Sequence, residues 1–99
     1  RRIVFVAIVE CVPERIRELA EFAAKRGPIK GIKLIGNYGT PVGKGVTDTV
    51  GKGVTILEAE SEESVFAYFS PMLPFFRKVE VHTALPMEKV MEFAALMKP

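Results

Sequence analysis

The stretch IVFVAIVE at residues 3–10 is apolar on both of the faces that an extended chain presents. Consecutive side chains of a β-strand point to opposite faces, so Ile3 and Phe5 share one face while Val4 and Val6 share the other. A strand with one face in water would alternate between apolar and polar residues. We therefore expect this strand to be central in its sheet and covered on both faces.

The rest of the chain supplies helices and further strands around it. The sequence predicts strands over residues 29–38, 54–59 and 76–83, and helices over residues 13–26, after Ser61, and over residues 87–98. The order strand, helix, strand, strand, helix, strand is the ferredoxin-like split βαβ arrangement, an α+β fold with an antiparallel sheet. Its usual strand order, 4-1-3-2, makes the first strand central, with two helices on one face and the other face open.

Several segments also predict which side chains face inward. Pro13 suits the first turn of a helix, and Gly27-Pro28 ends it. The apolar positions of that helix predict one buried stripe, made of Ile16, Leu19, Ala20 and Ala23, with Phe22 on its flank. The fourth strand alternates, with Val79 and Val81 inward and Lys78, Glu80 and His82 outward. One face of the last helix carries Met87, Val90, Met91, Ala94 and Met97.

Size and composition bound the class of protein. The 99 residues form one domain, with a net charge of +2 that gives no electrostatic footprint for nucleic acid or a membrane surface. Cys11 is the single cysteine, which favours a reducing, cytoplasmic location. No apolar run approaches the ~18–20 residues that span a bilayer. Because so short a chain has little to spare, we expect a second copy to cover the open face.

The segment at residues 39–53 is rich in glycine and contains the hexapeptide VGKGVT twice, at residues 42–47 and 50–55. A turn at residues 47–50 would make it a β-arm, and the alternative is a loop. Its glycine and lysine spacing does not match a Walker A motif, which requires four residues between a first glycine and the sequence Gly-Lys-Ser/Thr. Lys44 and Lys52 could still attract an anion.

The segments GIKLIGNY, VTILEAESEESVFAYF and LPFFRKVEVHTAL resemble the dimeric α+β barrel superfamily, and within it the DUF3303-like domains of unassigned function. The resemblance covers most of residues 3–83. It implies a homodimer in which two open sheets face each other and enclose a cleft. Members commonly carry an aromatic residue and a histidine after the second strand. Here Tyr38 keeps the aromatic residue, and Gly39 stands in the place of the histidine.

Glu58 and His82 are candidate catalytic residues. In the expected sheet they end the third and fourth strands and flank Val4 on either side, roughly 10 Å apart. His82 could act as a base near neutral pH while Glu58 orients a substrate or holds a proton. The alternative, which we prefer, is that His82 and Glu80 are rim residues at the end of a strand.

Tyr38 and Asn37 are candidate ligand-binding residues at the opposite end of the sheet, near Glu10 and Cys11. A phenol and an amide could orient a polar group in the cleft. The alternative is that Tyr38 packs against the second copy with its hydroxyl in water. Cys11 precedes a helix and could be a reactive thiol, but burial as a small hydrophobe is the preferred interpretation.

Other kinds of site find little support. The fold also hosts RNA-binding domains, where Phe5 could stack on a base, but the third strand has no aromatic residue to join it. One histidine makes no structural zinc site, so we expect no metal and no cofactor; haem on His82 is conceivable.

The preferred function is a homodimer that binds a small apolar or aromatic ligand between its sheets. The alternative is a cofactor-independent enzyme of the monooxygenase or isomerase kind, with His82 as base and with Glu58 and Tyr38 orienting the substrate. A third option is a regulatory effector sensor that works with a partner.

Overall fold

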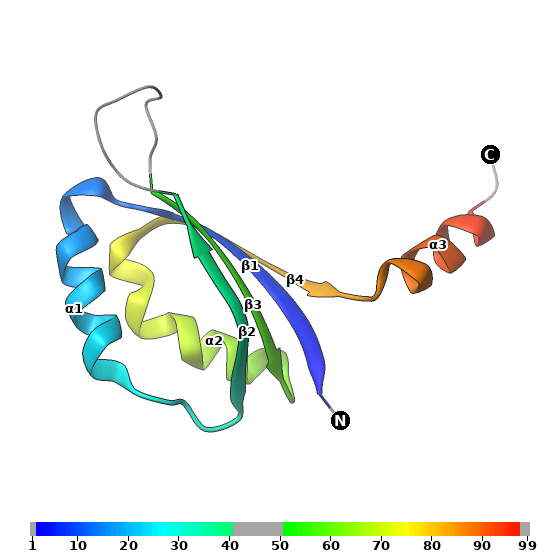
Figure 1. The fold of residues 1–99 in the computed structure, drawn as a ribbon, viewed down its shortest axis with the longest axis horizontal. Helices are drawn as coiled ribbons and strands as arrows, with labels where there is room; N and C mark the ends of the chain where they lie inside the picture. The colour runs from blue at the N-terminus through cyan, green and yellow to red at the C-terminus, as the bar shows by residue number, and fades with distance from the viewer. Residues whose placement is uncertain (1, 41–50, 98–99) are drawn as a thin grey trace.

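The structure is a computed structural model that describes residues 2–40 and 51–97 (Figure 1). Its strands are β1 (Ile3–Cys11), β2 (Ile32–Gly39), β3 (Lys52–Ala59) and β4 (Phe76–Ala84). Its α-helices are α1 (Ile16–Arg26), α2 (Glu62–Phe69) and α3 (Met87–Leu96). The 3-10 segment η1 (Pro13–Arg15) precedes α1, and a second, η2 (Ser70–Phe75), follows α2.

The sheet has the strand order β2-β3-β1-β4. β1 and β3 are therefore its two inner strands, and β2 and β4 are its edges. β1 pairs antiparallel with β3 along one edge and with β4 along the other. This is the predicted 4-1-3-2 order, so the ferredoxin-like α+β fold is confirmed. The central place of β1 is therefore as predicted, but only the face with Phe5, Ala7 and Val9 is buried within the chain, whereas Ile8 on the other face is 38% exposed.

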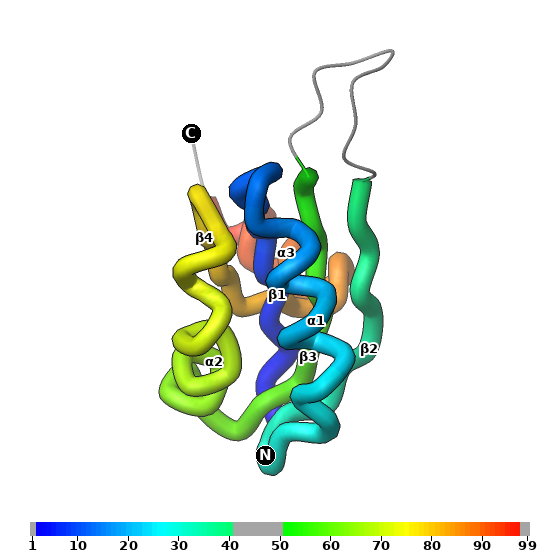
Figure 2. Tube along the Cα trace, turned by 90° about the vertical axis from the view of Figure 1, so that its left-hand side faces the viewer, coloured from blue at the N-terminus to red at the C-terminus, as the bar shows by residue number. Residues whose placement is uncertain are grey.

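One face of the sheet is covered by α1 and α2, which lie in front of the strands in Figure 2. The core lies between this face and α2. It contains Phe5 and Leu57, which are 1% and 0% exposed, packed with Val65 and Phe69 of α2 and Met72 of η2. These side chains are all apolar, so burying them removes hydrocarbon surface from water and stabilises the helix layer on the sheet.

α2 begins where the sequence predicts it to begin. The Ser61 side chain accepts a hydrogen bond from the Ser64 backbone N–H at 3.2 Å, which satisfies one of the free donors of the first turn. Glu62 and Glu63 lie in that turn, where the helix dipole favours negative charge. The chain then leaves α-helical geometry at Ser70, and Pro74 lies within η2.

α1 differs from its prediction in two respects. It starts at Ile16, because residues 13–15 form η1 instead. The predicted buried stripe is also wrong in part: Ile16, Leu19 and Phe22 are half-buried, whereas Ala20 and Ala23 are exposed. The physical reason is that α1 packs mainly against η1 and η2 and does not close onto the strands. Space therefore remains between α1 and the sheet.

β2 starts at Ile32, three residues later than predicted, because Gly31 turns the chain with a φ of +84°. The strand also contains a β-bulge. Leu34 pairs with Leu57 and Gly36 pairs with Ile56, so Ile35 has no partner on β3. The extra residue reverses the alternation of side chains beyond it.

α3 extends away from the rest of the molecule, on the side of the sheet opposite α1 and α2 (Figures 1 and 2). None of its residues is buried, and Met87, Met91 and Leu96 are 70%, 61% and 76% exposed. The radius of gyration is 15.7 Å. A compact chain of this length would have a value of about 13 Å. The helix is therefore formed as predicted but is not packed on its own domain.

The predicted loop or β-arm lies largely outside the described residues. This holds for the first VGKGVT copy, for the turn at residues 47–50 and for Lys44. Of the second copy, residues 52–55 form the start of β3.

Candidate functional site

The face of the sheet that α1 and α2 do not cover is called the open face here. Directly paired residues on antiparallel strands share a face, so its members follow from the register. Its centre is apolar and consists of Val4, Val6 and Ile8 of β1 with Val54 and Ile56 of β3. Ile8 and Val54 are 38% and 36% exposed. Polar side chains surround this centre, namely Tyr38, Glu58, Glu80 and His82 together with Glu10, Lys33, Lys52 and Lys78.

Glu58 and His82 both lie on the open face, but not at the same level of β1. Glu58 is opposite Val4, whereas His82 is opposite Val6. The predicted pairing of both with Val4 is therefore wrong for His82, because β4 continues to Ala84, which takes the position opposite Val4. Two strand spacings and an offset of two residues place their Cα atoms roughly 12 Å apart. A ligand could reach both groups, but they do not contact each other.

The carboxylate closest to His82 is Glu80, two residues earlier on the same strand. Glu80 Oε2 lies 4.0 Å from His82 Nε2, and Glu80 Oε1 lies 3.2 Å from Lys78 Nζ. The His82 side chain is 65% exposed in the single chain. Glu80 is thus the carboxylate that can orient the imidazole, whereas Glu58 was predicted to orient a substrate or hold a proton. Glu58 instead has Lys33 directly opposite it on β2.

Tyr38 lies on the open face at the other edge of the sheet. It is opposite Val54, and its side chain is 69% exposed. A Cβ atom added to Gly36 would lie 2.9 Å from Tyr38 Cε2, so the ring lies over Gly36 along the strand. Only a glycine lets the phenol lie against the sheet at this position. The hydroxyl group is thereby held near the surface of the open face.

Asn37 does not join Tyr38. Because of the bulge at Ile35, it lies on the helix side of the sheet, where Thr55 Oγ1 donates a hydrogen bond of 3.1 Å to Asn37 Oδ1. The prediction that both residues line one cleft is therefore wrong. Alternation alone already separates two consecutive residues, and the bulge decides that Asn37 faces the helices while Tyr38 lies on the open face.

Cys11 is buried at the end of β1, with 8% of its surface exposed. This burial raises the pKa of its thiol, because the thiolate would lose hydration. The preferred interpretation of Cys11 as a small hydrophobe is confirmed, and a reactive thiol with a lowered pKa is not supported.

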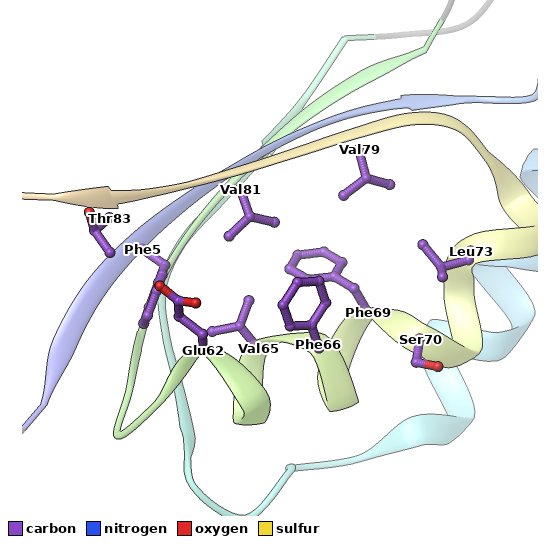
Figure 3. Close-up of a pocket in the computed structure, with 10 residues that line it drawn as sticks. All are labelled: Phe5, Glu62, Val65, Phe66, Phe69, Ser70, Leu73, Val79, Val81 and Thr83. Atoms are coloured by element: carbon purple, nitrogen blue, oxygen red, sulfur yellow. The ribbon is translucent and has the colours of Figure 1, made fainter.

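A groove that the sequence analysis missed lies on the helix side, between α2 and β4 (Figure 3). Its volume is about 550 Å³, and Phe66, Phe69, Val79 and Val81 project into it. Phe66 is nevertheless 70% exposed, because the groove opens at the edge of the sheet. The available signal was the run of apolar residues in α2, which has more large side chains than one buried face requires.

Other predictions concern residues whose surroundings are now defined. Phe5 points into the core and is 1% exposed, so it cannot stack on an RNA base. Lys52 Nζ lies 3.8 Å from Glu10 Oε1, so this carboxylate partly compensates the positive charge of Lys52. Across residues 2–40 and 51–97, no three His, Cys, Asp or Glu side chains gather as metal ligands would. In the same ranges, no helix is both long and apolar enough to cross a bilayer.

Two solved structures have a similar fold. The C-terminal domain of the MgtC protein from Mycobacterium tuberculosis aligns with a TM-score of 0.55 at 14% identity, over 83% of this chain and 87% of that one. The second is TftG, the 5-chloro-2-hydroxyhydroquinone dehydrochlorinase from Burkholderia phenoliruptrix AC1100, in complex with 2,5-dihydroxybenzoquinone. It aligns with a TM-score of 0.59 at 24% identity, over 83% of this chain and 93% of that one.

At these identities the likeness shows the fold alone, which is the ferredoxin-like fold that the sequence predicts. No family profile matches the chain, and no characterised protein matches its sequence. The narrower resemblance to the DUF3303-like domains stays a prediction.

Proposed function

We propose that this protein is a homodimer whose two open faces enclose a cleft for a small aromatic ligand that carries oxygen substituents. The observation that carries the proposal is the pattern of the open face. An apolar band through β1 and β3 is flanked by a phenol at the β2 edge and by an imidazole and a carboxylate at the β4 edge. Mostly apolar walls with a few polar groups are typical of small-molecule sites.

Two uncovered apolar surfaces support the dimer. One is the open face, and the other is α3, where Met87, Met91 and Leu96 are largely exposed. Contiguous apolar patches on monomers rarely exceed a few hundred Å², and larger ones mark interaction sites. A second copy of the chain is the simplest partner. In a symmetric dimer each copy buries its own open face and its own α3, so that one contact covers both surfaces of both copies.

Symmetry sharpens the proposal. A twofold axis that runs along the strands, between two facing sheets, places β2 of one copy opposite β4 of the other. Within one chain Tyr38 and His82 lie at opposite edges of the sheet, and three strand spacings with an offset of two residues place their Cα atoms about 16 Å apart. Across the cleft, Tyr38 of one copy would approach His82 of the second copy. Each dimer would then contain two equivalent sites, each built from both chains.

The ligand class follows from the same groups. A flat aromatic body suits the apolar band, and ring oxygens suit the phenol of Tyr38 and the imidazole of His82. TftG, which has this fold at 24% identity, was solved in complex with 2,5-dihydroxybenzoquinone. That molecule is a suitable first probe for this chain. The single buried Cys11 is in keeping with the cytoplasmic location that the sequence predicts.

A catalytic variant of this function uses the same cleft. The pair of His82 Nε2 and Glu80 Oε2, 4.0 Å apart, resembles a base with an orienting carboxylate. In that case His82 would remove a proton from a phenolic or carbon acid, and Glu80 would stabilise the imidazolium. His82→Ala would then abolish turnover of a hydroquinone substrate and leave the dimer intact.

Native mass spectrometry tests the dimer first. We expect a mass of two chains for the wild type, and a monomer for Ile56→Lys, which places a charge in the middle of the open face. Ala24→Lys is the matched control, because Ala24 is exposed on α1. A wild-type monomer at micromolar concentration would overturn the proposal.

Binding is then tested by titrating 2,5-dihydroxybenzoquinone and following it by calorimetry. Tyr38→Phe and His82→Ala should each weaken binding at least about tenfold, since each removes a hydrogen bond to the ligand. A mixed dimer of the two variants should recover one intact site in two. Full loss in the mixed dimer would show that both groups serve the ligand from the same chain.

A further inference from the structure

Arg26, the last residue of α1, is held between two aromatic rings. Its Cζ atom lies 4.3 Å from the centre of the Tyr68 ring and 5.4 Å from that of Phe22. Such cation–π contacts fix the plane of the guanidinium group and shield it from water. Arg26 is therefore a positioned cation and not a freely moving surface side chain.

One nitrogen of this group has no partner among the described residues. Arg26 Nη1 is fully buried and makes no hydrogen bond. A buried donor without an acceptor is costly, more so when it carries charge, and such groups call for a specific explanation. By contrast, Arg15 near the other end of the helix pairs with Glu18 at 2.9 Å and donates to the Pro74 carbonyl oxygen.

Arg26 also lines a space between the end of α1 and the sheet. A cavity of about 380 Å³ is lined there by Arg26, Asn37 and Tyr68, with apolar walls that include Ile29, Leu34 and Met72. A second cavity of about 330 Å³ continues under α1 and shares Ala23, Asn37, Tyr68 and Met72 with the first. Their volumes are in the usual range of ligand sites.

Asn37 adds a second donor to this cavity. Its Oδ1 already accepts the Thr55 hydroxyl, which leaves the amide N–H groups for another partner. No hydrogen bond from this amide is made within the described residues. No Asp or Glu side chain lines the first cavity. The cavity thus offers N–H donors and a positive charge, and it lacks an acceptor of matching charge.

We propose that this cavity is a binding site for the carboxylate of a small organic acid with an apolar body. The Arg26 guanidinium group and the Asn37 amide would donate to the carboxylate oxygens, and the ring of Tyr68 and the side chain of Met72 would contact the body. A carboxylate suits the planar guanidinium group through charge-assisted hydrogen bonds. The apolar walls favour such an acid over inorganic phosphate, which has no hydrocarbon part.

The site lies within one chain, on the helix side of the sheet, and is separate from the cleft between the open faces. Two features of the sequence create it. Gly27, with a φ of +70°, turns the chain directly after Arg26. The bulge at Ile35 turns Asn37 to this side. The inference does not depend on the proposed dimer.

Benzoate is the probe, and its neutral isostere benzyl alcohol is the control ligand. We expect saturable benzoate binding by calorimetry, at least about tenfold weaker for Arg26→Gln, and no comparable binding of benzyl alcohol. Arg17→Gln on the exposed side of α1 should bind as the wild type does. Wild-type protein that does not bind benzoate, or Arg26→Gln that binds it equally well, would overturn the proposal.

Two further measurements keep the test decisive if Arg26→Gln does not fold. In ¹⁵N-labelled wild type, benzoate should shift the side-chain amide signals of Asn37 and leave the backbone amide signals of Val6 and Ile56 on the open face unchanged. Asn37→Asp, at an exposed position, should abolish binding by placing a negative charge beside the carboxylate. Ile56→Lys should bind benzoate normally, so that failure of the dimer and failure of this site are told apart.

Discussion

The hydroxyl group of Thr55 donates a hydrogen bond of 3.1 Å to Oδ1 of Asn37, joining β3 to the edge strand β2 on the helix side of the sheet. The two partners differ in burial, since Thr55 is 7% exposed while Asn37 is largely accessible. Removing Asn37 and removing Thr55 should therefore lower the free energy of unfolding by different amounts.

Asn37→Ala should destabilise the protein more than Thr55→Val does. The first variant leaves a buried hydroxyl without an acceptor, which costs about 1–3 kcal/mol. The second leaves an accessible amide oxygen that water can reach, which costs about 0.5–1.5 kcal/mol. Urea unfolding of both variants checks the order. An equal or reversed order would show that Thr55 finds another acceptor.

Leu57 and its cross-strand partner Leu34 form a matched pair for testing the core. Both point to the helix side, but Leu57 is 0% exposed and Leu34 is 48% exposed. Leu57→Ala should cost about 2–5 kcal/mol, because it leaves a cavity. Leu34→Ala should cost about 1 kcal/mol or less, because its side chain is half in water. Thermal or urea unfolding measures both, and similar losses would mean that α1 covers β2 more closely in solution.

Cys11 gives the folded protein a defined dependence on pH. Burial raises the pKa of its thiol, so the unfolded chain loses the proton first, at an ordinary thiol pKa of about 8.5. Stability should therefore be complete below that pH and should fall as pH rises towards the higher pKa of the folded state. Unfolding free energies at neutral and alkaline pH, compared with those of Cys11→Ala, isolate this effect. The thiol should also react more slowly with a disulfide reagent than free glutathione does.

Met91 tests the role of α3 in association. If α3 packs on a second copy, Met91→Lys should weaken the dimer at least about tenfold while leaving the fold unchanged, because a charge replaces an apolar contact. Light scattering across a concentration series measures this, with far-UV circular dichroism as the check on folding. Glu88→Gln, also exposed on α3, is the control. A dimer that is unaffected by Met91→Lys would place the contact on the open face alone.

Gly36→Ala should move the Tyr38 ring with little effect on stability. The new Cβ would approach Tyr38 Cε2 to 2.9 Å, but the ring is 69% exposed and can turn aside. We expect a change in unfolding free energy below about 0.5 kcal/mol, as for most surface substitutions, together with weaker binding of 2,5-dihydroxybenzoquinone. Unchanged binding would show that the ring position is not used by the ligand.

The fold could be predicted from the sequence because strong local patterns agreed with one another. Three patterns each predict one element: the two apolar faces of β1, the cap of α2 at Ser61, and the alternation around Val79 and Val81 in β4. Together these elements fit one topology. Burial in α1 was predicted less well. Its stripe of Ile16 and Leu19 has helical spacing, but spacing cannot tell how far a helix stands from its sheet.

The candidate site was predicted only by residue type. Tyr38, Glu58 and His82 do share the open face, as the register shows. Glu80 and His82 were both predicted to face outward, but that they approach each other to 4.0 Å depends on their side-chain conformations, which alternation does not give. Arg26 was also missed, since a basic residue in the last turn of a helix is ordinary, and only its burial between Phe22 and Tyr68 makes it a candidate.

The unpaired Ile35 in β2 makes both proposed sites tolerant of one kind of mutation. Deleting this single codon would join Leu34 directly to Gly36, and each would keep its partner on β3, so Asn37 would stay on the helix side and Tyr38 on the open face. A strand of unchanged length that lost the bulge would instead exchange them, because a slip of one residue moves every later side chain to the opposite face. In descendants of this gene, a change in the length of β2 and a change in its pairing would therefore be expected to affect the recognised ligands differently.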